Sequence, residues 1–253
     1  AAAAAGAPGS AALPWPLEVR APLFRIKSAG AHLAAGACGG KSPVVAAVGG
    51  RWLTVHHVAN GATATFKAAR PMECVALSPA DALAATADES GRVHLWRLSA
   101  LDAAAAADAD SGPPSREMHW HAQRVGGVCF SADGAYVYTA GREGVLVLWR
   151  THDAERDFLP RLGAPISGLC AAADRATLAL RGSDNAVRLV DVPTRAVRRT
   201  IHGLRHASAM IVDPRLRALV MHGGAAGGTL QWWSHGACEQ LVALEVSPSN
   251  LSG

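Results

Sequence analysis

A short apolar segment that ends on a bulky residue recurs along this chain, and its spacing restricts the possible folds more than any other feature. The clearest copies are VHLW (93–96), LVLW (146–149), VRLV (187–190) and LQWW (230–233), and LTVH (53–56) is a weaker fifth. Their closing residues follow one another at intervals of 40, 53, 41 and 43 residues: His56, Trp96, Trp149, Val190 and Trp233. An interval of about 40 residues is the length of one four-stranded blade of a β-propeller.

The order of segments within each repeat favours the same architecture. In VCFSADGAYVYTA (128–140), two apolar segments flank the polar turn SADG, and a Gly- or Asx-rich turn such as GREG (141–144) then precedes the closing strand. These residue types accept a positive φ or cap their own backbone. In the closing strand, Val145, Val147 and Trp149 alternate with Leu146 and Leu148, so both faces of the strand can pack. We therefore predict an all-β fold, a β-propeller with about five visible blades.

The repeats also divide the chain. We predict a low-complexity Ala/Pro tail (1–20), five blades, an Ala/Asp/Pro-rich insertion (99–115) that accounts for the long interval, and a short tail (247–253). The predicted blades cover residues 21–71, 72–121, 122–164, 165–204 and 205–246. Closed propellers of this type commonly need roughly seven blades. We therefore expect this chain to be an incomplete part of a larger propeller.

Charge and cysteine usage limit the functional classes. The net charge is +4, and the positive residues are almost all arginine, crowded between Arg181 and Arg217. Arginine favours planar contacts with phosphate or carboxylate, although solvated surface charge explains the composition equally well. The five cysteines form no close metal-type pair, and three of them lie in similar apolar runs (Cys74, Cys129 and Cys170), which predicts reduced, buried thiols in an intracellular protein. No apolar run is long enough to predict a membrane-spanning helix.

Motifs that suggest catalysis are weak. GACGGKS (36–42) departs from the phosphate-loop pattern and leads into a strand, so we expect a turn. His119 and His121 could begin a zinc site, but the spacing indicates no third ligand, and His121 suits a hydrogen-bonded position at the start of a blade. The sequon NLS (250–252) conflicts with the reduced cysteines, and no nucleophile elbow is present. We expect no catalytic residues, no cofactor, no metal and no small-molecule substrate.

Two blocks carry a family resemblance. HWHAQRVGGVCFSADGAYVYTAGREGVLVLWR (119–150) and DFLPRLGAPI (157–166), with GSDNAVRLVDV (182–192), IVDPRLRALVMHG (211–223) and GTLQWWS (228–234), resemble the WD repeat-containing protein 75 family. The similarity covers residues 72 to 246 and, more weakly, 22 to 71. Members of that family are larger and have two tandem propellers, so the resemblance implies that this chain corresponds to later blades of the first propeller.

The resemblance implies a nucleolar, non-enzymatic scaffold with no membrane partner. Its expected partners are other WD-repeat proteins of the UtpA subcomplex of the small-subunit processome and the 5′ external spacer of pre-ribosomal RNA. The implied role is early 18S rRNA maturation with a link to RNA polymerase I transcription. The alternative is a generic WD-repeat adaptor, such as a ubiquitin-ligase substrate receptor; a propeller hydrolase is disfavoured because no site converges.

Two sets of residues follow from this interpretation. The candidate RNA or partner contacts are Arg142, Glu143, Arg150, Arg161, Arg195, Arg198 and Arg199. The structural positions of the blades are Trp96, Trp149, Val190, Trp233 and His121.

Overall fold

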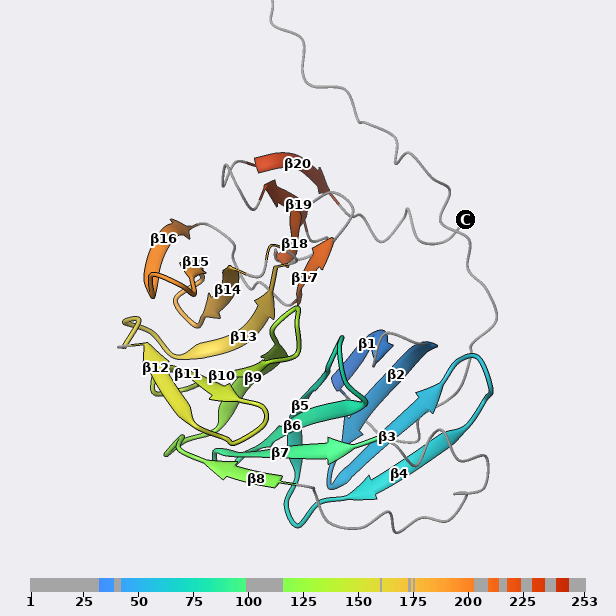
Figure 1. Cartoon of the computed structure of the whole chain (residues 1–253). Coiled ribbons are helices and arrows are strands. Elements are labelled where there is room, and N and C mark those ends of the chain that lie inside the picture. The colour runs from blue at the N-terminus through green and yellow to red at the C-terminus, as the bar shows by residue number, and fades with distance from the viewer. Residues whose placement is uncertain are drawn as a thin grey trace, which may run out of the picture.

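The chain folds into a succession of antiparallel β-sheets (Figure 1). The structure, a computed structural model, describes residues 32–38, 42–98, 116–159, 161–172, 174, 176–202, 209–213, 218–223, 229–234 and 240–245. The predicted tails (1–20 and 247–253), the insertion (99–115), the sequon and residues 39–41 of GACGGKS lie outside this part. No helix within the described ranges is long and apolar enough to cross a membrane.

Each sheet contains four strands that pair in chain order, and we call each sheet a blade. Blade 1 contains β1 (His32–Cys38), β2 (Ser42–Gly49), β3 (Trp52–His57) and β4 (Thr63–Lys67). Blade 2 contains β5 (Met72–Leu77), β6 (Leu83–Asp88), β7 (Arg92–Arg97) and β8 (Arg116–His119). Blade 3 contains β9 (Val125–Phe130), β10 (Tyr136–Gly141), β11 (Leu146–Arg150) and β12 (Arg156–Leu159).

The last two sheets repeat the same pattern. Blade 4 contains β13 (Ile166–Ala171), β14 (Thr177–Gly182), β15 (Val187–Asp191) and β16 (Ala196–Ile201). Blade 5 contains β17 (Ala209–Asp213), β18 (Ala218–Gly223), β19 (Thr229–Ser234) and β20 (Gln240–Glu245). The five recurrent apolar segments therefore form the third strand of each blade, and the predicted all-β propeller architecture is confirmed. Over the described residues the arc of blades is open between blade 5 and blade 1 (Figure 1).

The blades pack face to face, and their first strands line the inside of the arc, where each contacts the first strand of the next blade. An apolar cluster fills each interface, as expected when both faces of a sheet are covered. The period-two alternation of β11 explains how one strand serves two interfaces. Val147 and Trp149 pack toward blade 2, whereas Leu146 and Leu148 pack toward blade 4.

The turns between the second and third strands have a common conformation in blades 2, 3 and 4. The fourth turn residue adopts a positive φ in each case: 86° at Gly91, 73° at Gly144 and 57° at Asn185. Gly and Asn tolerate this conformation best, so the turn sequences specify it. These turns and the links between blades form one side of the arc, which we call face A. The other two connections within each blade form the opposite side, face B.

Candidate functional site

Blade 3 contains a continuous chain of side-chain hydrogen bonds that runs from its core to its turn on face A. The indole Nε1 of Trp149 donates to Thr139 Oγ1 at 2.9 Å. The same hydroxyl lies 2.8 Å from Nε2 of His121, a residue in the link from blade 2, and Nδ1 of His121 contacts Oε1 of Glu143 in the turn. Trp149, Thr139 and His121 are buried, and the Glu143 side chain is only 11% exposed. The network therefore fixes two strands, the turn and the link relative to one another.

The donors in this network determine the state of His121. The indole N–H of Trp149 donates to Thr139 Oγ1, and the Glu143 carboxylate can only accept, so in the neutral ring of His121 Nε2 accepts the hydroxyl hydrogen of Thr139. Nδ1 then carries the ring hydrogen and donates it to the Glu143 carboxylate. Burial lowers the pKa of His121, and the contact with Glu143 opposes that shift in part. Both ring nitrogens are thus engaged inside the blade.

The acid of the turn occupies different sequence positions in blades 2 and 3. In blade 2, Asp88 at the end of β6 accepts hydrogen bonds from the N–H groups of Ser90 (2.9 Å) and Arg92 (3.0 Å). Burial acts to raise the pKa of Asp88, but hydrogen bonds from Arg92, Ser90 and His94 lower it overall. Gly141 has the corresponding position in blade 3, and a Cβ there would lie 2.7 Å from Oε2 of Glu143.

The Glu143 carboxylate consequently fills the space that an aspartate side chain at position 141 would need. The turn GREG therefore has its acid at the third position, two residues after the position that Asp88 has in blade 2. Glu143 was predicted as a candidate contact residue, and its contact with an external partner stays a prediction.

The other structural positions differ in their partners. Trp96 is buried and donates to Thr86 Oγ1 at 2.8 Å, which repeats the Trp149–Thr139 pair. Val190 is fully buried in an apolar cluster. Trp233 is half-buried and donates to Gln231 Oε1 at 3.1 Å, so blade 5 does not repeat the bond between neighbouring strands.

The structure does not gather the predicted contact arginines into one surface. Arg150 ends β11 toward face B and pairs with Asp153 (2.9 Å) and Glu155 (2.8 Å). The hydrogen bond and charge of Asp153, with the charge of Glu155, raise the pKa of Arg150 further above its ordinary value. Arg161 is exposed in the link between blades 3 and 4.

The three arginines at blade 4 lie on or next to its outer strand. Arg195 adopts a positive φ of 56° before β16 and forms an ion pair with Asp157 of blade 3. Arg198 lies 3.7 Å from the Asp191 carboxylate, and Arg199 is exposed on the same strand. Carboxylates of the chain itself therefore contact two of these three guanidinium groups.

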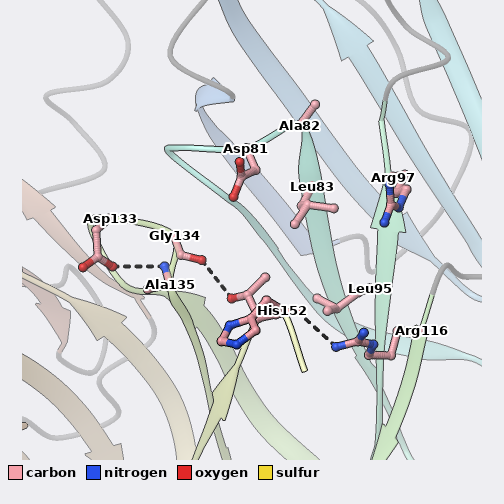
Figure 2. Close-up of a pocket in the computed structure, with 11 residues that line it drawn as sticks. Asp81, Ala82, Leu83, Leu95, Arg97, Arg116, Asp133, Gly134, Ala135 and His152 are labelled. Carbon is pink, nitrogen blue, oxygen red and sulfur yellow. Dashed lines mark hydrogen bonds between the residues drawn. The ribbon is translucent and has the colours of Figure 1, made fainter. Parts of the chain in front are cut away.

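A cavity of about 560 Å³ opens on face B between blades 2 and 3 (Figure 2). Arg97 and Arg116 lie on one side, and Asp133 and Gly134 on the other. The Arg116 guanidinium donates to the carbonyl of Thr151 at 3.3 Å. The lining mixes both charges, and its Thr151 hydroxyl donates to the Gly134 carbonyl at 2.8 Å, so the cavity can hold a polar segment.

A second cavity, of about 540 Å³, opens on face A between blades 2, 3 and 4. It brings Arg142 together with Arg124 and Arg181. Sequence reasoning missed the last two because they belong to different blades. Arg124 lies directly before the first strand of blade 3, and Arg181 lies directly before the turn on face A of blade 4. An alignment of the blades by these positions could have identified both residues.

The described thiols and metal-ligand side chains form no reactive centre. Burial is the main cause that raises the pKa of Cys74 and Cys170 to about 12 and that of Cys129 well above its ordinary value. The three thiols therefore stay protonated at neutral pH and are poor nucleophiles. In the described ranges, no group of three or more His, Cys, Asp or Glu side chains is arranged to hold a metal ion.

Comparison with known proteins identifies a family and several relatives that this chain resembles. The family model described as the WD repeat-containing protein 75 first beta-propeller matches residues 34–185. WD repeat-containing protein 75 of Danio rerio is 33% identical over 178 residues, which cover 68% of this chain and 20% of the fish protein. The Homo sapiens protein of the same name is 28% identical over 223 residues, covering 83% of this chain and 26% of the human protein.

A fungal protein extends the comparison. U3 small nucleolar RNA-associated protein 17 of Schizosaccharomyces pombe is 29% identical over 146 residues, covering 56% of this chain and 16% of that protein. The chain thus spans about a quarter or less of the length of each of these relatives. The matched region contains the network of blade 3, including the GREG turn.

Proposed function

The chain belongs to the WD repeat-containing protein 75 family, and from this membership we propose that it is part of a non-enzymatic scaffold in ribosome biogenesis, a component of the small-subunit processome. The observation that carries the proposal is the similarity to U3 small nucleolar RNA-associated protein 17, because that name connects the same propeller to a nucleolar RNA. The buried thiols and the engaged His121 support a structural rather than a catalytic role.

The finer parts of the proposal concern location and partners. We place the protein in the nucleolus, among other WD-repeat proteins of the UtpA subcomplex. There it assists early 18S rRNA maturation on the 5′ external spacer of pre-ribosomal RNA, with a link to RNA polymerase I transcription. Stacked blades with fixed interfaces support this role, since a rigid scaffold can hold several partners at defined positions.

Affinity purification of the tagged full-length protein tests the proposal. We expect recovery of processome proteins and U3 RNA, and we expect depletion of the protein to reduce 18S rRNA and accumulate its early precursors. Recovery of cullin-linked components without processome proteins would instead support the ubiquitin-ligase adaptor. Signal from a fluorescent fusion outside the nucleolus, combined with normal 18S levels on depletion, would contradict the proposal.

The exposed arginines at β16 are the proposed contacts at the outer strand. Replacing Arg195, Arg198 and Arg199 together by glutamine should weaken crosslinking to pre-rRNA or association with UtpA proteins, because charge that faces solvent is removed. Unchanged recovery of both would refute this assignment. Arg156, which is exposed on the outer strand of blade 3, provides a control for the loss of positive charge.

A further inference from the structure

The cavity on face A is built by equivalent positions of three consecutive blades. It is lined by the beginnings of the first strands of blades 2, 3 and 4 and by the turns on face A of blades 3 and 4: Glu73, Arg124, Val125, Gly126, Arg142, Pro165, Ile166, Ser167, Arg181 and Ser183. The repeat of the fold therefore brings equivalent residues of neighbouring blades around one opening, although they lie about 40 to 53 positions apart in the sequence.

A β-bulge lies at the same position in each of these first strands. The pairing with the second strand skips Glu73 in β5, Gly126 in β9 and Ser167 in β13. A bulged residue leaves the ladder, and its side chain is turned to a new direction, which is why bulges often border binding sites. All three bulged residues line the cavity.

At the central bulge the backbone of β9 lies directly against the backbone of β13. Gly126 has no side chain, and a Cβ there would lie 2.0 Å from the carbonyl oxygen of Ile166. Val125 and Ile166 are 1% and 3% exposed, so they contribute almost no apolar surface to a ligand. The polar groups that the cavity offers are three guanidinium groups, two hydroxyl groups and the Glu73 carboxylate, next to the exposed Pro165.

The charges in the cavity are unbalanced. The lining contains three guanidinium groups and one carboxylate, that of Glu73. Arg124 is paired with Glu73, and Arg142 is exposed. Within the described part of the chain, the Arg142 side chain takes part in no hydrogen bond or ion pair, and only its backbone N–H donates, to the Arg124 carbonyl. Arg181 is held in place by its Nε, which donates to Ser167 Oγ at 3.0 Å, and by its Nη2, which donates to the Ser167 carbonyl at 2.8 Å. Burial lowers the pKa of Arg181, as expected for a cation that lacks full solvation.

We propose that this cavity binds a backbone phosphate of single-stranded RNA, with Arg142 as the principal contact and with Arg124 and Arg181 completing the cationic site. The inference rests on the proposed function, which supplies an RNA partner. Guanidinium groups match phosphate oxygens in a planar, bidentate manner. No aromatic side chain lines the cavity, so it lacks a platform for base stacking, and contact with the phosphate alone is independent of base sequence.

The lining also favours RNA over an acidic protein segment. Peptide sites usually add an apolar pocket or a free sheet edge to their charges. Here Val125 and Ile166 are buried, Pro165 is the one exposed apolar residue of the lining, and a bulge interrupts each first strand, the inner edge strand of its sheet, at the cavity. A flexible single strand can place one phosphate into a recess, and its neighbouring phosphates remain available to exposed arginines on the same face.

Titration of a fluorescently labelled oligouridine with the purified full-length protein tests the site. We expect Arg142→Gln to weaken binding about fivefold and to reduce the dependence of log K on log salt by about one unit. The double variant Arg124→Gln/Arg142→Gln should weaken binding further. Arg51→Gln is the matched control, because Arg51 lies in the connection between the second and third strands of blade 1, is exposed and does not line the cavity. Unfolding midpoints should be equal for Arg142→Gln, Arg51→Gln and the wild type.

The proposal is overturned if both cavity variants bind oligouridine as the Arg51 variant does. It is also overturned if an oligoglutamate peptide binds the wild type, loses affinity in Arg142→Gln, and oligouridine binding does not change. Recovery of U3 RNA by the tagged protein is measured separately. Normal recovery with unchanged oligouridine binding rejects the site alone, whereas Arg142-dependent binding without recovery of U3 or processome proteins rejects the proposed function alone.

Discussion

Blades 3 and 4 have the same topology, and they stabilise their cores in opposite ways. In blade 3 the equivalent positions of link, second strand and third strand are His121, Thr139 and Trp149, which hydrogen-bond to one another. The corresponding residues of blade 4 are Leu162, Leu180 and Val190, which belong to one apolar cluster. The acidic residues in the face A turns of the two blades differ in the same way. Glu143 contacts His121 inside blade 3, whereas Asp184 of blade 4 pairs with Arg188 at the surface.

The comparison shows that the polar network is not needed to form a blade. At these three positions, burial of apolar side chains alone stabilises blade 4, and its buried polar residues Thr177 and Asp191 bond within their own turns, to Asp174 and Thr194. The hydrogen bonds of blade 3 add a geometric constraint, because each donor must be oriented toward its acceptor. Blade 3 thus has one defined arrangement of link and turn next to the arginine cavity.

The largest expected effect comes from the third-strand position. Trp149→Ala should lower the free energy of unfolding by about 3–5 kcal/mol, since it removes a large buried side chain and the donor to Thr139 Oγ1. Val190→Ala should cost about 2 kcal/mol, since only two methyl groups are lost. Urea denaturation of both variants measures the difference. Equal losses of unfolding free energy in the two variants would contradict the proposed difference between blades 3 and 4.

A smaller effect isolates the hydrogen bonds. Thr139→Val keeps the shape of the side chain but leaves the Trp149 N–H and His121 Nε2 without their partner, so it should cost about 1–3 kcal/mol. Thr86→Val in blade 2 is the matched control, because it removes the partner of Trp96. If the two variants lose the same stability, His121 contributes nothing to the network.

The position of the acid in the turn of blade 3 can be tested by moving it from residue 143 to residue 141. Gly141→Asp should cost about 1–2 kcal/mol, because the new Cβ lies 2.7 Å from Glu143 Oε2 and the two carboxylates repel. Adding Glu143→Ser to Gly141→Asp should restore most of the loss, since the turn then carries its acid where blade 2 has Asp88. Thermal unfolding of the three proteins decides the point; failure of the second change to rescue would show that the two positions are not interchangeable.

The smallest expected effect is a pH dependence that blade 4 lacks. Burial lowers the pKa of His121 below its unfolded value of about 6.5, so the unfolded chain binds the proton more readily. The stabilisation is therefore complete above about pH 6.5 and is lost as the pH falls toward the folded-state pKa. Glu143 offsets part of the shift, which keeps the effect small. Unfolding midpoints between pH 7.5 and 5.5 should fall for the wild type and fall less for His121→Leu, and identical slopes would contradict the assignment.

The fold was predictable from the sequence because its signals are local and repeated. Strand alternation around Trp149 and the turn GREG depend on neighbours within about ten residues, and the family resemblance placed them in a propeller. The role of Glu143 was not predictable from such local signals, because its partner His121 lies 22 positions away and reaches it only through the link between blades. The cavity on face A required three blades to be stacked before Arg124, Arg142 and Arg181 became neighbours.

The glycines that open β9 have a mechanical consequence. A Cβ on Gly126 would lie 2.0 Å from the Ile166 carbonyl oxygen, and one on Gly127 would lie 2.8 Å from the Leu169 nitrogen, so the backbones of two blades touch at the hub. A side chain at either position would act as a wedge on the inside of the arc. The outer strands β12 and β16 lie at the far end of their sheets from β9 and β13. A small separation of β9 from β13 would therefore displace the outer strands by a larger distance. Gly126 and Gly127 therefore allow the close backbone contact that fixes the spacing of blades 3 and 4 on the inside of the arc.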